Sequence, residues 1–147
     1  MAAWAYYTME VMETAESTSR RMAAVRHEAT SVEMALRRAV RKAGLVGYRV
    51  NLRTLPGAPD MAFTRWRVAV FVDGAFWHGH PRKFPEQKMS EYWLRKIERN
   101  RRRDRRVSRE LRRMGWRVLR FWDFEVEADP RRAVRKIRGA LGRAQSA

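Results

Sequence analysis

Residues 59–73 read PDMAFTRWRVAVFVD, and this stretch decides the fold. Two apolar runs, at 60–63 and 67–72, stand on either side of a three-residue connection, which predicts two strands joined as a hairpin. If the strands pair about that connection, Asp60 and Asp73 become diagonal neighbours on one face of the sheet. A slip of one residue in the register would separate the two carboxylates.

The remaining elements follow from hydrophobic periodicity and from breaker residues on either side of this hairpin. They are a helix over 31–43, a strand over 48–52, a loop over 73–89, a helix over 90–114, a strand over 116–122 and a helix over 130–142. This order is typical of an α/β protein with a mixed sheet. The 147 residues suit one domain, which we place at 20–147, with 1–19 as an N-terminal arm or tail.

Composition limits the classes of function. Lys and Arg number 33 against 16 Asp and Glu, a formal net charge of +17, and residues 95–120 hold 13 basic and 3 acidic residues. Such a field favours nucleic-acid binding, although Arg is also an abundant surface residue in some proteomes. The absence of cysteine excludes disulfides, a thiolate nucleophile and Cys-ligated zinc. Without a membrane-spanning run or a signal-like start, we expect a cytoplasmic protein that makes no membrane contact.

Two carboxylates at one sheet edge form the first candidate site. Asp60 opens one strand, opposite Phe71 in the expected register, and Asp73 closes the next strand. Such a pair suits magnesium, which prefers oxygen ligands, although both could be ordinary turn acids. Glu33 is the acid of a capping box at 30–33, and it could instead face this site from the first helix.

The long basic helix carries the second candidate site. Asn100 and Asp104 share its apolar stripe, whereas most of its arginines lie on the other side. An inward carboxylate needs a partner, and a histidine is the natural one, with an arginine salt bridge as the alternative. His78 in the preceding loop would then be a general acid or base oriented by Asp104. The stripe also contains Ile97, Val107, Leu111 and Met114.

Aromatic residues beside the basic helix are candidates for contact with bases. Phe76 and Trp77 are adjacent in a glycine-flanked loop, and Trp93 lies in the first turn of the helix. Exposed aromatics next to a basic face can wedge between base pairs or stack on a base, whereas core packing is the alternative. We assign Trp116 and Trp122 to the core.

Together these segments resemble the very-short-patch repair (Vsr) mismatch endonucleases, a branch of the PD-(D/E)xK restriction-endonuclease-like fold. The resemblance runs from about Thr18 to Val126, and the spacing of four motifs agrees. These are Leu55-Pro56-Gly57-Ala58-Pro59-Asp60, then Phe71-Val72-Asp73-Gly74-Ala75-Phe76-Trp77-His78-Gly79-His80, then Glu91-Tyr92-Trp93-Leu94-Arg95-Lys96-Ile97 with Asn100 and Asp104, and Gly115-Trp116-Arg117-Val118-Leu119 followed by Trp122.

The resemblance implies a three-layer fold with a central mixed sheet flanked by helices, and a monomeric, magnesium-dependent endonuclease. Such an enzyme nicks double-stranded DNA at a T:G-like mismatch or another distorted site during repair. Its alternatives are a nuclease of the same fold that acts on another DNA structure or modified site, and a DNA-binding module without catalysis. By this resemblance Asp60 ligates magnesium, His78 is catalytic, and Asp104 is the partner of His78. The intercalating residues are Phe76, Trp77 and Trp93, and the further candidates for DNA contact are Arg20, Arg21, Arg95, Lys96 and Asn100.

The chain departs from the family pattern at two places. The family has a histidine where this chain has Asp73, which adds a metal ligand or base to the expected catalytic set of Asp60, Asp73, His78, Asp104 and Glu33. The family also has a structural zinc held by three cysteines and a histidine. Here only the histidine remains, as His80, because the cysteine positions hold Ala75, Arg82 and Phe124. We therefore expect no structural zinc.

Overall fold

The computed structural model describes residues 15–82 and 89–146, which fold around a four-stranded sheet in the order β1-β2-β3-β4. The first three strands pair antiparallel, and β4 lies parallel to β3. This confirms the predicted α/β fold with a mixed sheet. The strands are β1 (Arg49–Val50), β2 (Met61–Phe63), β3 (Val68–Asp73) and β4 (Arg117–Trp122). The helices are α1 (Ala15–Lys42), the 3₁₀ helix η2 (Thr64–Trp66), α2 (Glu91–Arg113), α3 (Asp123–Ala128) and α4 (Pro130–Gln145).

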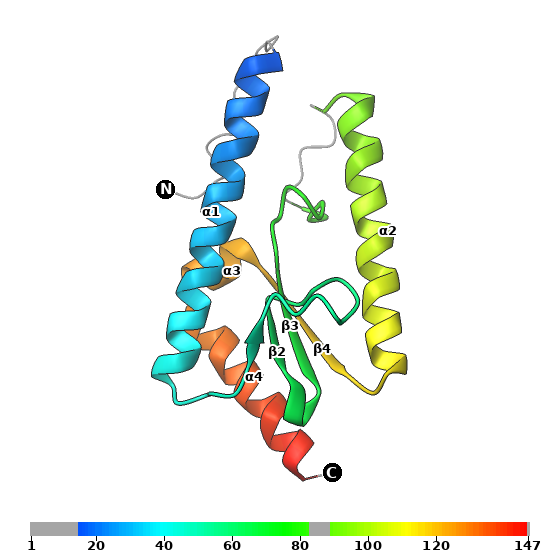
Figure 1. The fold of residues 1–147 in the computed structure, drawn as a ribbon. Coiled ribbons are helices and arrows are strands. Elements are labelled where there is room, and N and C mark those ends of the chain that lie inside the picture. The colour runs from blue at the N-terminus through cyan, green and yellow to red at the C-terminus, as the bar shows by residue number, and fades with distance from the viewer. Residues whose placement is uncertain (1–14, 83–88, 147) are drawn as a thin grey trace.

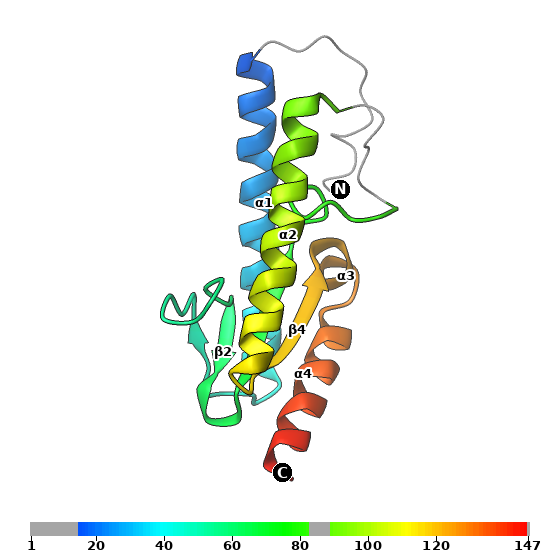
Figure 2. The ribbon, with the colours of Figure 1, turned by 90° about the vertical axis from the view of Figure 1, so that its right-hand side faces the viewer.

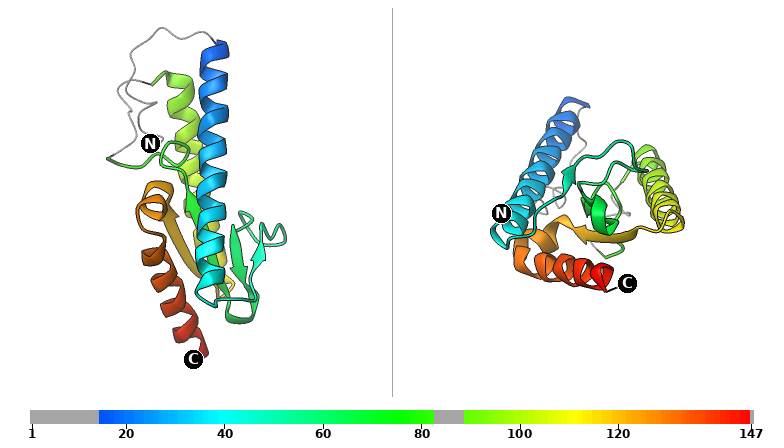
Figure 3. Two further views of the ribbon diagram at one scale, coloured as in Figure 1. Left: turned by 90° about the vertical axis from the view of Figure 1, so that its left-hand side faces the viewer. Right: turned by 60° about the horizontal axis from the view of Figure 1, so that its bottom comes forward.

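The two faces of the sheet are covered by different helices, which gives three layers (Figure 3). Successive side chains of a strand point to opposite faces. Val68 and Val70 of β3 therefore join a core with α1 and α4, whereas Ala69 and Phe71 pack against α2. The larger core includes Leu36, Val40, Met61, Phe63, Phe121, Val126, Val134, Ile137 and Leu141. These apolar layers carry most of the favourable free energy of folding.

The register of the hairpin agrees with the sequence prediction. Met61 pairs with Val70 and Phe63 with Val68, so the next residue, Asp60, falls opposite Phe71. The connection is the short helix η2. Asp73 at the end of β3 and Asp60 just before β2 therefore lie at the same edge of the sheet and on the face that α2 covers.

The first helix is longer than predicted. α1 begins at Ala15, not at residue 31, and it includes the last residues of the segment assigned to an arm; residues 1–14 lie outside the described part. The stretch 15–42 contains neither Gly nor Pro, so nothing in it breaks a helix. Thr30 was expected to cap the helix, but it lies within it.

Three smaller expectations were wrong. β1 spans only two residues instead of 48–52. Helix α3 was not predicted at all, because its six residues are too few to show a periodicity, and it is fixed by burial of Val126. Met114 was placed on the inward stripe of α2, but it is the residue after the last turn and is 44% exposed.

Helices α1 and α2 stand on opposite sides of the sheet and extend beyond the same end of it (Figures 1 and 2). The strand ends that carry the acidic side chains lie between the two helices. Within the described ranges, none of the helices combines the length and apolar character that a membrane span requires.

The turn before Asp60 depends on a glycine. Gly57 has φ +73°, and a Cβ added there would lie 2.6 Å from Val107 Cγ1. We expect Gly57→Ala to lower the free energy of unfolding by about 2–4 kcal/mol, because overpacking costs about 1–3 kcal/mol and left-handed backbone about 1 kcal/mol. Urea unfolding measures the loss.

Gly44→Ala is the matched control. Gly44 has φ +77°, but an added Cβ there has no neighbour within 4 Å. Only the backbone cost of about 1 kcal/mol is expected. Equal losses in the two variants would show that the contact with Val107 contributes nothing to the position of this turn.

Candidate active site

A cavity of about 330 Å³ lies where α1, α2 and the ends of β3 and β4 meet. Its walls include the turn at Gly57 and Ala58 and the apolar side chain of Val107. Its charged and titratable lining consists of Glu33, Asp60, Asp73, His78, Arg103, Asp104 and Arg120. All five residues predicted to be catalytic therefore line one cavity, although they come from four separate segments of the chain.

Asp60 is held in the wall of this cavity by the backbone of the neighbouring strand. Its Oδ2 accepts a hydrogen bond of 2.7 Å from the amide of Val72. Burial raises the pKa of Asp60, the hydrogen bond from Val72 lowers it, and the charge of Asp73 raises it further. The carboxylate is thus held in place in an environment that disfavours its negative charge.

Glu33 reaches the same cavity from α1. Burial and the neighbouring charge of Asp60 raise the pKa of Glu33 to about 7, while Arg37, at 3.8 Å from its Oε2, lowers it. The capping-box role does not apply, since Glu33 lies inside the helix. Two acids that repel each other in a buried position fit a divalent cation, which would relieve both the repulsion and the burial cost.

His78 contacts Asp104, as the stripe of α2 predicted. The His78 Nδ1–H donates to Asp104 Oδ2, and the same nitrogen lies 3.8 Å from Asp73 Oδ1. An arginine, the alternative partner predicted for Asp104, is also close to it, because Arg120 Nη1 lies 3.9 Å from Asp104 Oδ1. With Nδ1 engaged, Nε2 is the ring nitrogen that can exchange a proton with a substrate.

Side chains of α2 hold the loop that carries His78. The Asn100 amide donates to the Trp77 carbonyl at 2.8 Å, and Arg101 Nη2 donates to the Gly79 carbonyl at 2.7 Å. Asp123 Oδ1 accepts from the Ala75 amide at 3.2 Å, while burial raises the pKa of Asp123. Asn100 therefore supports the loop in this structure, and its predicted DNA contact remains a prediction.

The aromatic residues form one cluster, and Phe76 does not occupy the exposed position expected of it. Phe76 is 2% exposed and packs against Ile97 of α2, because apolar surface on both sides of it is available for burial. Trp77 and Trp93 are half-buried, with ring centroids 6.0 Å apart, and Lys96 Nζ lies within 5.3 Å of both rings. Trp77 and Trp93 are therefore the members of the predicted set that reach the surface.

An aromatic contact occupies the place expected of the zinc site. The His80 ring packs edge-on against Trp122 and Phe124, at centroid distances of 4.7 and 5.2 Å. Trp122 is thus half-buried beside the loop, and Trp116 is partly buried against α2. Among residues 15–82 and 89–146, no three His, Cys, Asp or Glu side chains are grouped so that they alone could hold a metal. That the protein lacks zinc stays a prediction.

Arg120 is the residue that the sequence reasoning missed. Its Nη1 donates to both oxygens of Asp73, at 2.8 and 3.1 Å, so the predicted metal ligand Asp73 is paired with a guanidinium. Burial raises the pKa of Asp73, while His78 and Arg120 lower it. A signal was present in the sequence, because Arg120 alternates with Leu119 and Phe121 of the core and so had to point to the other buried face.

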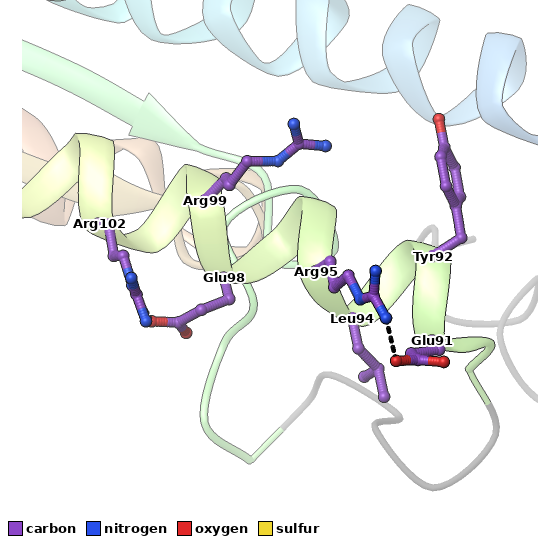
Figure 4. Close-up of a pocket in the computed structure, with 7 residues that line it drawn as sticks. All are labelled: Glu91, Tyr92, Leu94, Arg95, Glu98, Arg99 and Arg102. Carbon is purple, nitrogen blue, oxygen red and sulfur yellow. Dashed lines mark hydrogen bonds and ion pairs between the residues drawn. The ribbon is translucent and has the colours of Figure 1, made fainter.

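A second hollow, of about 920 Å³, lies along the first half of α2 and carries none of the predicted catalytic groups. Arg99 and Tyr92 point toward α1, whereas Arg95 meets Glu91 and Arg102 meets Glu98 along the helix (Figure 4). Tyr92 is 63% exposed. This surface is basic and aromatic, which suits a phosphate backbone better than it suits catalysis.

The other predicted contacts are exposed or lie outside the described side chains. Arg95 is exposed, and Lys96 lies against the Trp rings. Arg20 of α1 is exposed, while the side chain of Arg21 lies outside the described part.

Comparison with known proteins finds one family. A family model described as DNA mismatch endonuclease Vsr matches residues 9–83. The chain is 40% identical to the type II nicking enzyme V.NmeDIP of Neisseria meningitidis serogroup C, over 87% of this chain and 88% of that protein. It is 44% identical to V.NaeI of Lentzea aerocolonigenes (79% and 73%) and 38% identical to the DNA mismatch endonuclease Vsr of Escherichia coli K12 (71% and 68%).

The raised pKa of Glu33 predicts how stability changes with pH. The folded protein keeps a proton on Glu33 up to about pH 7, whereas the unfolded chain releases it near 4.5. The contribution of Glu33 to stability therefore falls as pH rises between these values. We expect Glu33→Gln, without divalent ions, to lose less stability than the wild type between about pH 5 and about pH 8. Chemical unfolding at several pH values measures the difference.

The exposed Glu110 of α2 provides the control, and Glu110→Gln should follow the wild-type pH dependence. If Glu33→Gln also follows the wild type, Glu33 does not hold a proton in the folded protein.

Proposed function

Because this chain belongs to the Vsr family of DNA mismatch endonucleases, we propose that it nicks one strand of duplex DNA at a T:G-like mismatch or another distorted site, with magnesium. The chain is a DNA endonuclease, and several of its relatives are named nicking enzymes. The observation that carries the catalytic part of the proposal is the contact between His78 and Asp104 at the cavity that holds Asp60. Because the substrate is DNA, we also propose that the protein acts in the cytoplasm.

Asp60 and Glu33 are the residues that would hold the magnesium ion. Both are partly buried acids with raised pKa values, and they face each other in one cavity. Magnesium keeps several waters and needs only one or two carboxylates when phosphate oxygens complete its shell, so a three-residue cage is not required. When bound, the ion supplies positive charge beside the scissile phosphate and lowers the pKa of a coordinated water.

His78 is suited to move the proton that hydrolysis requires. Asp104 fixes the tautomer and the orientation of the ring by accepting from Nδ1, which leaves Nε2 to take a proton from the attacking water or to give one to the leaving oxygen. Arg103 lines the same cavity and offers a cation to the phosphate. The enclosed site holds these groups in place before DNA binds, so little reorganisation is needed.

The surface around this cavity supports the binding of one duplex by a single copy of the chain. α1 and α2 stand on opposite sides of the strand ends, and the net charge of +17 attracts the phosphate backbone (Figure 1). The basic hollow at Arg95, Arg99 and Arg102 and the pair Trp77 and Trp93 lie on the same helix and loop that hold His78. Phosphate contacts would position the duplex, and the Trp rings would insert more readily where its bases are poorly stacked.

A second substrate class is compatible with the same chemistry. Relatives that carry the name type II nicking enzyme include V.NmeDIP and V.HpaIIP, and neither name specifies a mismatch. A nuclease of this fold that acts on another DNA structure or modified site is therefore the alternative. The purely binding module is set aside, because the chain is an endonuclease.

The test of the proposal is a set of end-labelled duplexes, perfect and mismatched, with and without magnesium. The wild type should nick a mismatched duplex only when magnesium is present. His78→Ala and Asp104→Asn should each reduce the rate, and the double variant should be little slower than His78→Ala, because groups that act as one unit are not additive.

Binding of the same duplexes by these variants serves as the control, and it should stay within a few-fold of the wild type because the arginine field is unchanged. Losses that multiply in the double variant would show that Asp104 does not act through His78. Equal nicking of perfect and mismatched duplexes would contradict the mismatch part of the proposal.

Trp77 should decide the preference for distorted DNA. An inserted ring must offset an unstacking cost of a few kcal/mol, which is smaller where the bases are already poorly stacked. We expect Trp77→Ala to remove the preference for mismatched over perfect duplex with little loss of stability, since the ring is half-buried. Relative nicking rates and thermal unfolding measure the two effects.

Phe76→Ala is the matched control from the same cluster. Because Phe76 is 2% exposed, its truncation should cost roughly 3–5 kcal/mol of stability. If Trp77→Ala destabilises the fold equally and still discriminates between the duplexes, Trp77 is a core residue and not the wedge.

A further inference from the structure

The guanidinium of Arg120 lies inside the carboxylate cavity, and no other residue of β4 lines that cavity. Arg120 of β4 pairs in parallel register with Phe71, and its guanidinium carbon lies 4.2 Å from the centre of that ring. The arginine side chain is 22% exposed, and that of its partner Asp73 is 9% exposed. A cation that stacks on a ring and meets a buried carboxylate is a fixed part of the site, not a surface charge.

Every branch of this guanidinium has a partner. Nη1 bridges both oxygens of Asp73, at 2.8 and 3.1 Å. Nε donates to Ser108 Oγ at 2.9 Å, and Nη2 donates to the backbone carbonyl of Asp104 at 3.4 Å. Ser108 is itself buried, at 6% exposure. Arg120 therefore joins β3 to α2, and it cannot leave Asp73 without giving up its contacts to the helix.

The charges in the cavity indicate the role of Arg120. Four acids line it, namely Glu33, Asp60, Asp73 and Asp104, and Asp104 has His78 as its partner. Asp60 and Glu33 face each other, and Arg37 lies 3.8 Å from Glu33 without offsetting the burial that raises the pKa of both acids. Asp73 differs, because both of its oxygens are engaged by Arg120. A carboxylate that accepts two such hydrogen bonds has little capacity left for a metal ion.

We propose that Arg120 is a positioning residue that fills, with a fixed cation, the place beside Asp73 that a metal ion would otherwise take. The cavity then accepts one divalent ion, at Asp60 and Glu33. This inference rests on the proposed metal-dependent nicking. Arg120 also favours the pairing of His78 with Asp104. It engages the other nearby carboxylate, Asp73, whose Oδ1 lies 3.8 Å from His78 Nδ1.

The number of metal ions bound by the free protein tests this assignment. Free Mn²⁺, which shares the oxygen preference of magnesium, is measured by electron paramagnetic resonance as the full chain is titrated without DNA. The wild type should bind one ion per chain. Arg120→Met should bind two, and Arg120→Met with Asp73→Asn should return to one. Arg113→Met, which removes an exposed arginine at the end of α2, should stay at one.

Three further variants keep the test decisive if Arg120→Met does not fold. Arg120→Lys retains a cation and should bind one ion. Asp73→Asn should keep the wild-type Mn²⁺ affinity within about threefold, because Asp73 is not a ligand, whereas Asp60→Asn should lose binding. A large loss of Mn²⁺ affinity in Asp73→Asn, or a wild type that binds two ions or none, would overturn the proposal.

These outcomes are separable from those of the proposed function. A wild type that binds one Mn²⁺ and shows the expected variant pattern, but nicks no duplex, would contradict the nicking reaction and support the role of Arg120. A wild type that nicks mismatched DNA with magnesium, but loses Mn²⁺ binding in Asp73→Asn, would overturn the role of Arg120 alone.

Discussion

Met61 pairs with Val70, Ala62 with Ala69 and Phe63 with Val68, and this register is the constraint on which the site depends. It brings Asp60 beside β3, where the Val72 amide holds the carboxylate at 2.7 Å. The parallel pairing of β3 with β4 then places Arg120 next to Asp73. Because side chains alternate between the faces of a sheet, a shift of one residue in either pairing would move these groups into the apolar core.

Burial and ion pairing have opposite effects on the acids of the site. Apolar layers on both faces of the sheet bury the acids, and burial raises the pKa values of Glu33, Asp60 and Asp73. The same burial strengthens each ion pair that is present, because the local dielectric is low. Arg120 satisfies Asp73, and His78 satisfies Asp104. The remaining pair, Asp60 and Glu33, keeps pKa values raised by burial although Arg37 lies 3.8 Å from Glu33, and this pair is the one that we propose for a divalent ion.

The loop that carries His78 is positioned by contacts with other elements of the fold. It is held by hydrogen bonds from Asn100 and Arg101 of α2, and the ring of His80 is fixed between Trp122 and Phe124. Rigid aromatic contacts of this kind bury area and need no thiolate. The orientation of His78 therefore depends on α2 and β4 together, which explains why both elements contribute side chains to the cavity.

The sequence by itself determined the hairpin, its register and the inward position of Asp104, because each follows from a short local pattern of apolar and polar residues. The sequence predicted a histidine or an arginine as the partner of Asp104, and in the structure both His78 and Arg120 lie beside it. Only the tertiary structure decided that Phe76 is buried against Ile97 and that Arg120 takes up Asp73. Those two facts depend on contacts between segments more than 20 residues apart, and no local pattern records which of several basic or apolar residues fills a given space.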